Sequence, residues 1–331
     1  MTPVTPDTEL TLVFQNQRAV VSPWGASLRR YLCLDTDGRE IDIVWGYSGG
    51  GGKRGGQGDV LIPFAGRIGH GRYSFDGQAF QLECNDKEGP NAIHGFVRSL
   101  PWQVQEVDAT HVTFAVRLSA ATYANRGYPF SLDVAVTYQL DRQGLSCVFL
   151  VRNVGDHPAP IGVGFHPYFT VGTTMIDEAE VRIPAAGYLE FNEQLVPTGK
   201  ICSVTGTPWD YRRFRTIAQQ RFNHCYVNVE RDPQGIATAT LRHPTSGRII
   251  DVVMDSAFSA LVVYTGDAIA DAPRAALAIE PMTCASDAFN HPEWGLKRLV
   301  PGETFSGRYA VQHRTMERND SITAPTGKRF E

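Results

Sequence analysis

Proline and glycine interrupt this chain so often that long helices have little room to form. The 331 residues include 20 prolines and 32 glycines, which break helices and favour turns. Within residues 130–152, apolar side chains alternate with polar or small ones on both sides of the turn sequence Asp141–Gly144. A period of two is typical of strands with one buried face, so this stretch predicts an antiparallel hairpin.

Similar short strand signals recur along the rest of the chain. They occupy residues 73–82 (with a turn at Asp76-Gly77), 111–118, 241–254 (broken at 243–247), 260–264 and 275–279. Many short antiparallel strands predict an all-β protein built from two packed sheets or a barrel. No stretch resembles a linker, so we expect a single β-sandwich domain over residues 1–313. Residues 314–331 are polar and predict a flexible C-terminal tail.

Composition and charge exclude several classes of partner. The net charge is -4 and like charges form no block, so nucleic acid is not an expected partner. No apolar run approaches the ~20 residues that a membrane-spanning helix needs. The six cysteines include no CxxC pair, and the start MTPVTPDTEL has neither a basic nor an apolar segment. We therefore expect a cytoplasmic protein, without structural zinc, that acts on a small neutral or weakly charged molecule.

The segment Gly46–Gly58 contains a run of glycines that predicts a mobile surface loop. Lys53 and Arg54 lie within it, so a second interpretation is a lid whose two cations close over a ligand phosphate. The segment is not a P-loop, because no Ser or Thr follows Lys53 and no helical pattern succeeds it.

Four polar residues lie in local sequences that suit a ligand site. His94 and His166 are surrounded by glycines and followed by Gly or Pro, which let another molecule approach the backbone closely. Glu280 follows an apolar run, where loss of solvent would raise its pKa from ~4.3 and make it a better base near neutrality. Arg67 could hold a ligand oxygen or the Glu280 carboxylate. Each residue also has a purely structural interpretation: a hydrogen-bonded histidine, a solvated carboxylate or a surface ion pair.

Six stretches, in the same order, resemble the aldose 1-epimerase (galactose mutarotase) family. They are GRIGHGRYSFDGQAFQL with Arg67, NAIHGFVRSLPWQV with His94, GYPFSLDVAVTYQL, GVGFHPYF with His166, RFNHCYV, and AIEPMTCASDAFN with Glu280 followed by LVPGETF. Together they span about Leu61 to Arg308. The resemblance implies a large antiparallel β-sandwich of the galactose mutarotase type.

The resemblance also implies a mechanism, in which a sugar ring opens and closes again. Glu280 would take the proton from the C1 hydroxyl while His166 donates one to the ring oxygen, and His94 would hydrogen-bond near that oxygen. Arg67 would position sugar hydroxyls, and Tyr168 or Trp294 could offer a flat face. An acid and a base at opposite sides of one hemiacetal suffice, because the reaction involves no redox change, so no cofactor or metal is expected. The expected partner is a monosaccharide, and the protein is expected to be a monomer or a homodimer.

Asn223 departs from the family pattern, because many members carry Asp at this position. An amide accepts hydrogen bonds but lacks charge, so galactose-type recognition would be altered. A hexose-6-phosphate 1-epimerase, suggested by Asn223 with Lys53 and Arg54, and a non-catalytic carbohydrate-binding protein therefore stay open. A metal site formed by His94, His166, His224 and Glu280 has less support, because these residues lack ligand spacing.

Overall fold

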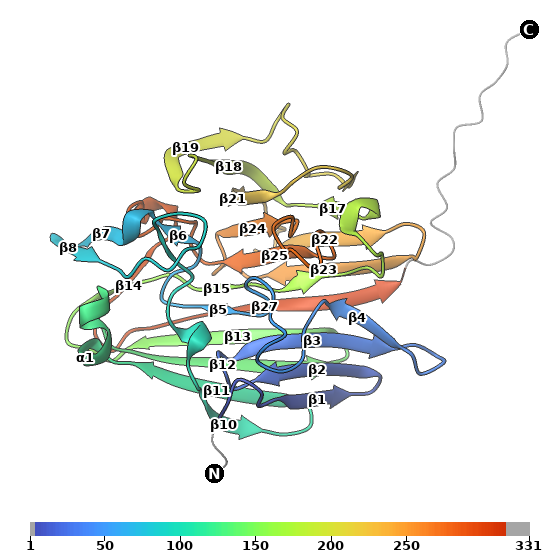
Figure 1. The fold of residues 1–331 in the computed structure, drawn as a ribbon, viewed down its shortest axis with the longest axis horizontal. Helices are drawn as coiled ribbons and strands as arrows, with labels where there is room; N and C mark the ends of the chain where they lie inside the picture. The colour runs from blue at the N-terminus through green and yellow to red at the C-terminus, as the bar shows by residue number, and fades with distance from the viewer. Residues whose placement is uncertain (1–3, 316–331) are drawn as a thin grey trace, which may run out of the picture.

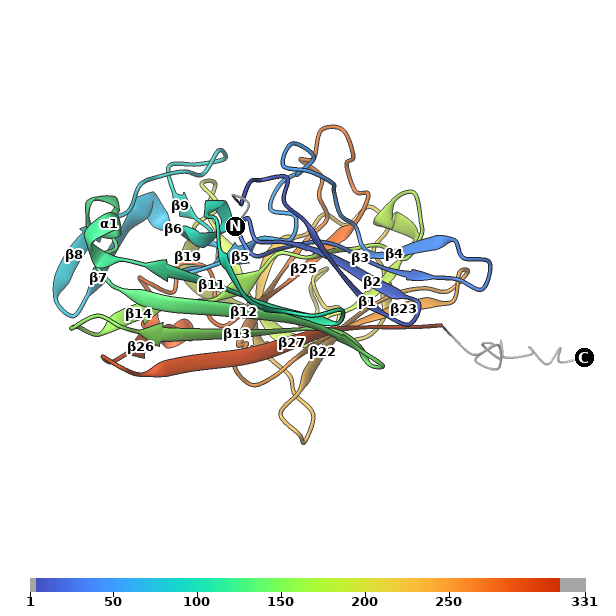
Figure 2. The same cartoon turned by 90° about the horizontal axis from the view of Figure 1, so that it is seen from below.

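The computed structural model describes residues 4–315, which form two large antiparallel sheets packed face to face (Figures 1 and 2). The first sheet has 12 strands in the order β1 (Leu10–Phe14), β2 (Gln17–Ser22), β3 (Ser27–Leu34), β4 (Glu40–Val44), β16 (Tyr168–Phe169), β25 (Leu277–Met282), β24 (Ala260–Tyr264), β21 (Asn223–Val229), β18 (Ala185–Phe191) and β19 (Pro197–Ser203), with β15 (Gly164–Phe165) joining β25 to β5 (Val60–Leu61).

The second sheet has nine strands. Their order is β10 (Gln103–Val107), β11 (His111–Leu118), β12 (Leu132–Asp141), β13 (Gly144–Asn153), β27 (Thr304–Thr315), β23 (Arg248–Met254), β22 (Ala237–His243), β17 (Glu180–Arg182) and β20 (Arg215–Thr216). Three small pairs complete the described strands: β14 (Ala159–Ile161) with β26 (Lys297–Leu299), β6 (Arg67–Ile68) with β9 (Ala92–Ile93), and β7 (Arg72–Phe75) with β8 (Gln78–Gln81).

Helices are short in the described part of the chain. They are α1 (Ala120–Tyr123) and the 3-10 helices η1 (Gly69–Gly71), η2 (Val97–Ser99), η3 (Ala124–Arg126), η4 (Ile176–Glu178) and η5 (Pro292–Trp294). The all-β prediction is confirmed, and the large antiparallel sandwich is the arrangement that these strands adopt.

The predicted hairpins form where their turn sequences indicated. β12 and β13 pair without interruption from Leu132 opposite Asn153 to Asp141 opposite Gly144. Asp76 and Gly77 both have positive φ in the tight turn between β7 and β8, which is the geometry that Asp-Gly favours in hairpins. The strand predicted over 275–279 instead occupies Leu277–Met282, so Glu280 lies inside the strand rather than after its end.

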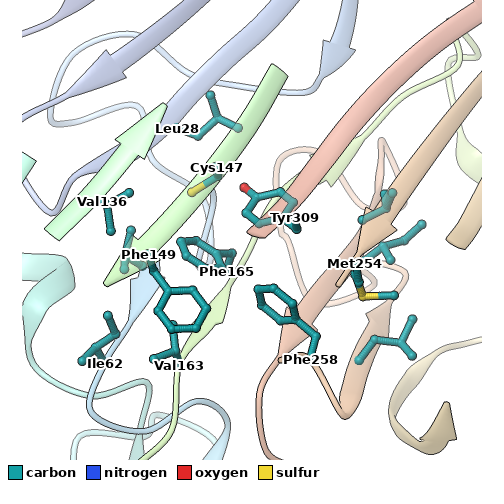
Figure 3. Packing of buried hydrophobic residues seen from close by; sticks show 14 of the residues in the cluster. Leu28, Ile62, Val136, Cys147, Phe149, Val163, Phe165, Met254, Phe258 and Tyr309 are labelled. Carbon is teal, nitrogen blue, oxygen red and sulfur yellow. The ribbon is translucent and has the colours of Figure 1, made fainter. Parts of the chain in front are cut away.

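The core fills the space between the two sheets (Figure 3). Phe165 of the first sheet packs against Tyr309 of the second with ring centroids 4.9 Å apart, and also contacts Phe149 at 6.3 Å. The hydroxyl of Tyr138 crosses the same layer to donate to the carbonyl of Ala26 at 2.8 Å. Burial of such large apolar side chains is the main stabilising contribution of a sandwich core.

The last strand extends slightly past the predicted end of the domain. Arg314 and Thr315, expected in the tail, lie in β27 opposite Ile249 and Arg248. The remainder of the predicted tail, residues 316–331, lies outside the described residues. Across residues 4–315 no helix is long and apolar enough to cross a membrane.

The first sheet turns its second face away from this core, and that face carries both polar and apolar side chains. Glu280 of β25 lies opposite Val262 of β24, which lies opposite Cys225 of β21. One step along, Ala278 lies opposite Tyr264, which lies opposite Asn223. Directly paired residues share a face, and the intervening Ile279 and Val263 belong to the core. The register therefore directs Glu280 and Asn223 to the outer face.

Candidate active site

A cleft of about 620 Å³ opens over the outer face of the first sheet. All five residues predicted from the sequence line it: Arg67, His94, His166, Asn223 and Glu280. They come from β6, the end of β9, the junction of β15 and β16, β21 and β25. Residues far apart along the chain thus meet in one hollow, which also contains polar groups that the sequence analysis did not identify.

Glu280 forms part of the floor of this cleft. Its residue is 2% exposed, because β25 is flanked by β24 and β16 in the middle of the sheet. Burial raises the pKa of the Glu280 carboxyl well above its usual value, the Arg67 charge opposes the rise, and the Asp59 charge adds to it. The expected rise in pKa is confirmed, although Glu280 lies within the strand rather than at its end.

His166 lies beside Glu280, with Nε2 3.3 Å from the carboxylate oxygen Oε1. Its backbone N–H donates to the carbonyl of Asp59 at 3.0 Å, and its ring stacks on Tyr168 with centroids 5.1 Å apart and planes 16° apart. A Cβ at Gly56 would lie 2.5 Å from His166 Cδ2. The imidazole is therefore held between the sheet and the glycine segment.

Burial is the main cause that lowers the pKa of His166 to about 3, and the Arg98 charge lowers it further. Both shifts in the pair favour neutral partners: a protonated Glu280 and an uncharged imidazole. The alternative pair, a carboxylate beside an imidazolium, contains the same number of protons. A bound molecule can therefore convert one form into the other without exchanging a proton with solvent.

His94 completes the group. Its ring lies 5.4 Å from that of His166 at 79°, and its Nδ1 is buried without a hydrogen-bond partner among the described residues. Burial first, and the His166 charge second, lower the pKa of His94 well below its usual value. His94 has φ of 65°, an unusual conformation for a residue other than glycine that is frequent at functional sites.

The next residue, Gly95, explains how His94 reaches the cleft. Gly95 has φ of 63°, and a Cβ there would lie 2.1 Å from the carbonyl oxygen of Ile62. Only glycine permits this close approach of two backbones. The glycine after His94 thus serves the packing of two segments of this chain, whereas the sequence pattern had suggested close approach of another molecule.

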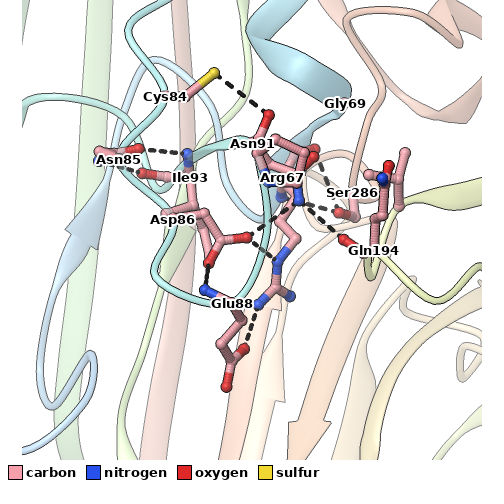
Figure 4. A network of polar contacts seen from close by, with 12 residues as sticks. Arg67, Gly69, Cys84, Asn85, Asp86, Glu88, Asn91, Ile93, Gln194 and Ser286 are labelled. Carbon is pink, nitrogen blue, oxygen red and sulfur yellow. Dashed lines mark hydrogen bonds and ion pairs between the residues drawn. The ribbon is translucent and has the colours of Figure 1, made fainter.

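Arg67 is engaged by two carboxylates that the sequence analysis did not identify (Figure 4). Its Nε donates to Asp86 at 2.7 Å and its Nη2 donates to Glu88 at 2.6 Å. Asp86 also accepts from Asn91 at 3.2 Å. The ion pair between Arg67 and Asp86 is largely buried, since these side chains are 12% and 4% exposed, whereas Glu88 remains exposed. The only local signal for these acids was their position in the polar run before His94.

Asn223 begins β21 and lies opposite Tyr264, another residue that lines the cleft. Its backbone N–H donates to Nδ1 of His224 at 3.2 Å. Tyr168, one of the two aromatic candidates, also lines the cleft, whereas Trp294 is not among the lining residues and instead stacks on His291 with centroids 3.9 Å apart.

The glycine segment is not simply a surface loop, because Gly56, Gln57 and Gly58 are buried. The reason is that its second half packs against the first sheet, where the N–H of Gly58 donates to the carbonyl of His166 at 3.0 Å. Its two cations already have carboxylate partners: Lys53 contacts Asp59, and Arg54 donates to Asp271 at 2.6 Å. Arg98 reaches the same Asp59 at 3.4 Å.

The four residues considered for a metal site do not form one. Among residues 4–315, no group of three or more His, Cys, Asp or Glu side chains is arranged to hold a metal ion. His224 instead packs on Trp209, with ring centroids 3.8 Å apart.

Comparisons with known proteins show what this chain is similar to. The family model described as Aldose 1-epimerase matches residues 9–312. The uncharacterized protein YihR of Escherichia coli (strain K12) is 33% identical over 234 residues, which are 70% of this chain and 71% of YihR. Galactose mutarotase of Bos taurus is 29% identical over 314 residues, which are 87% of this chain and 88% of the relative.

Solved structures show the same fold. The GalM/aldose epimerase homologue from C. elegans superposes with a TM-score of 0.82 at 20% identity, and the match covers 94% of this chain and 99% of that one. A putative aldose 1-epimerase from E. coli K12 has a TM-score of 0.78 at 21% identity, covering 93% and 99%.

Proposed function

This chain belongs to the aldose 1-epimerase family, and we propose on that premise that it interconverts the α and β anomers of an aldose by acid–base opening and reclosure of the ring. The observation that carries the proposal is the separation of 3.3 Å between His166 Nε2 and Glu280 Oε1 on the floor of the cleft. A binding protein would need neither this buried acid–base pair nor its shifted pKa values.

Ring opening needs two proton transfers, one at each of the two oxygen atoms bonded to C1. The Glu280 carboxylate accepts the proton of the C1 hydroxyl, and the electrons of that O–H bond form the C1 carbonyl. The bond between C1 and the ring oxygen breaks, and the ring oxygen takes its electrons together with a proton from His166. Each positioned acid or base is worth about 10²–10⁴ in rate.

The position of the pair fits this chemistry. Both reacting oxygens are bonded to C1, so the two catalytic groups must reach neighbouring atoms, and His166 and Glu280 lie side by side. The open-chain aldehyde then rotates about its C1–C2 bond, and the same two groups reverse their roles during closure. No oxidation or reduction occurs, so these steps require no cofactor.

The other residues of the cleft would bind the sugar. His94 would hydrogen-bond near the ring oxygen, which the position of its ring beside that of His166 supports. Arg67 is held by Asp86 and Glu88, so it would present its remaining N–H groups to sugar hydroxyls. Asn223 would accept or donate one hydrogen bond.

Exchange spectroscopy by NMR on α-glucose, α-galactose and a panel of other aldoses tests the proposal. We expect at least one aldose to interconvert faster with the protein than in buffer alone, and the Glu280→Gln variant to lose that acceleration. Calorimetric binding of a sugar whose anomerisation rate stays unchanged would contradict the proposal and favour a carbohydrate-binding protein.

A further inference from the structure

The cations around the cleft differ in how many carboxylate partners they have. Arg67 has two carboxylate partners, and Arg54 has Asp271. At the histidine end, by contrast, Lys53 and Arg98 share the single carboxylate of Asp59, whose side chain is completely buried. Two cations around one anion leave a positive charge unmatched at this end of the cleft.

Arg98 also has unused hydrogen-bonding capacity. Its guanidinium carries five N–H donors, yet its side chain makes one hydrogen bond among the described residues, to Asp59 at 3.4 Å. That side chain is 23% exposed and lines the cleft. No Arg98 nitrogen is among the buried polar atoms of residues 4–315 that lack a partner, so its unpaired N–H groups remain open to the cleft, where an oxyanion would accept from them.

Both cations lie next to the reacting end of the proposed substrate. Asp59, which they share, accepts the backbone N–H of His166 through its carbonyl, and the segment that carries Lys53 packs on the His166 ring through Gly56. In a pyranose, the ring oxygen that His166 would protonate is bonded to C5, and C5 carries C6. A group on C6 therefore extends from the histidine side of the ring.

We propose that Lys53 and Arg98 form an oxyanion-binding subsite for a charged group at C6 of the aldose, a phosphate or a carboxylate. This inference rests on the proposed function and specifies its substrate class. Of the two loop cations considered from the sequence, it retains Lys53 and replaces Arg54, whose charge Asp271 already matches, by Arg98. The buried Asp59 holds both cations in place and does not itself contact the substrate.

The test compares glucose 6-phosphate and glucuronate with glucose, using kcat/KM for anomerisation above the enzyme-free rate. We expect at least one of the two anionic sugars to exceed glucose by about tenfold or more, because charge-assisted hydrogen bonds are worth about 10- to 100-fold in affinity. The preferred anionic sugar identifies the phosphate or the carboxylate as the ligand. A kcat/KM for glucose equal to or above both anionic values overturns the subsite and leaves the proposed function intact.

Two variants of the cleft locate the effect. Arg98→Gln should lower the ratio of anionic to neutral kcat/KM at least about tenfold, and Lys53→Gln should lower it in the same direction. Arg54→Gln, which removes a cation already paired with Asp271, should leave the ratio unchanged. Equal ratios in Arg98→Gln and Arg54→Gln would overturn the assignment. Unfolding midpoints of all three variants verify that they fold.

A binding measurement separates this inference from the proposed function. If no aldose is anomerised, the proposed function fails, and calorimetry with glucose 6-phosphate and glucuronate then tests the subsite alone. Binding at least about tenfold weaker in Arg98→Gln than in the parent protein supports the subsite. Equal binding by the two proteins, or no binding by either, overturns it.

Discussion

Two hollows of nearly equal size lie on different sheets of this protein. The cleft on the first sheet measures about 620 Å³, and a groove on the second sheet, lined mainly by residues of β10, β11, β12 and β13, measures about 640 Å³. In the groove, Arg117 and Asp133 pair with each other at 2.5 Å and remain exposed to solvent. In the cleft, Glu280 and His166 are buried together.

The comparison shows that two hollows of similar volume can differ in how strongly they shift the pKa values of the groups they hold. Solvent around Arg117 and Asp133 screens their charges, so their ion pair contributes little. Burial of Glu280 and His166 moves their pKa values in opposite directions, up for the carboxyl and down to about 3 for the imidazole. Both shifts favour the proton on Glu280, so the ionised pair that the proposed mechanism uses forms when a bound sugar stabilises it.

Among the changes that test this comparison, replacing Glu280 should lower turnover the most. Glu280→Gln keeps the shape of the side chain but removes the base, so we expect turnover to fall by about 10²–10⁴ with sugar binding retained. NMR exchange rates measure turnover, and calorimetry measures binding.

The matched control is Arg117→Gln in the groove of the second sheet, which should keep turnover within about twofold, because surface changes away from a site rarely matter. Comparable losses in both variants would mean that the cleft is not the reactive hollow.

Substitutions of the two histidines should lower turnover by different amounts. His166→Asn removes the proposed acid, so we expect a loss of about 10²–10³ in turnover. His94→Asn removes only a neighbouring hydrogen bond and should be milder, about tenfold. Steady-state rates across an aldose panel measure both. A larger loss at His94 than at His166 would reverse the two roles.

Gly56→Ala tests whether the glycine segment positions His166. The added Cβ would lie 2.5 Å from the ring of His166, so either the ring or the segment must move. Displacement of about 1 Å can cost about 10²-fold in rate, and we expect a loss of up to that size in kcat. Gly51→Ala, at a position where a Cβ meets nothing within 4 Å, should leave kcat unchanged. Equal rates in both variants would show that His166 does not depend on Gly56.

The smallest predicted effect concerns stability and pH. Burial lowers the pKa of His94 in the folded protein, whereas the unfolded chain titrates near ~6.5. The unfolded state therefore binds more protons as pH falls below ~6.5, and the folded state loses about 1.4 kcal/mol of stability per pH unit from this residue.

His94→Asn removes that contribution. Urea unfolding between pH 7 and 5 should show a free energy that falls less steeply with decreasing pH in the variant, with the difference approaching about that amount per pH unit near pH 5. His166 and Glu280 are present in both proteins, so the difference in slope reports His94 together with its coupling to His166. Identical slopes would mean that His94 is not buried in its neutral form.

Local patterns predicted local structure well. The hairpin of β12 and β13 follows from alternation and a turn between adjacent segments, and the Asp76-Gly77 turn follows from the φ values that these residues tolerate. The limits of β25 were less predictable. Alternation does not show where a strand ends, and Glu280 is buried within β25 because β24 and β16 flank it.

The candidate site was predictable through the family resemblance rather than from local sequence. His94, His166 and Glu280 each had an equally good structural interpretation in isolation. Asp59 and Arg98 gave no signal, and Asp86 and Glu88 gave only their position in a polar run, because an ion pair between distant residues has no sequence period. Their partners became visible only in the folded chain.

By itself, the order of residues determined that this chain forms short antiparallel strands joined by tight turns, since period-two alternation and glycine turns act over a few neighbouring residues. The tertiary structure alone decided that Glu280 and His166 are buried side by side and that Lys53 and Arg98 share the carboxylate of Asp59. The physical reason is that desolvation and charge pairing depend on distances between atoms in space, which strand register and sheet order establish only when the chain has folded.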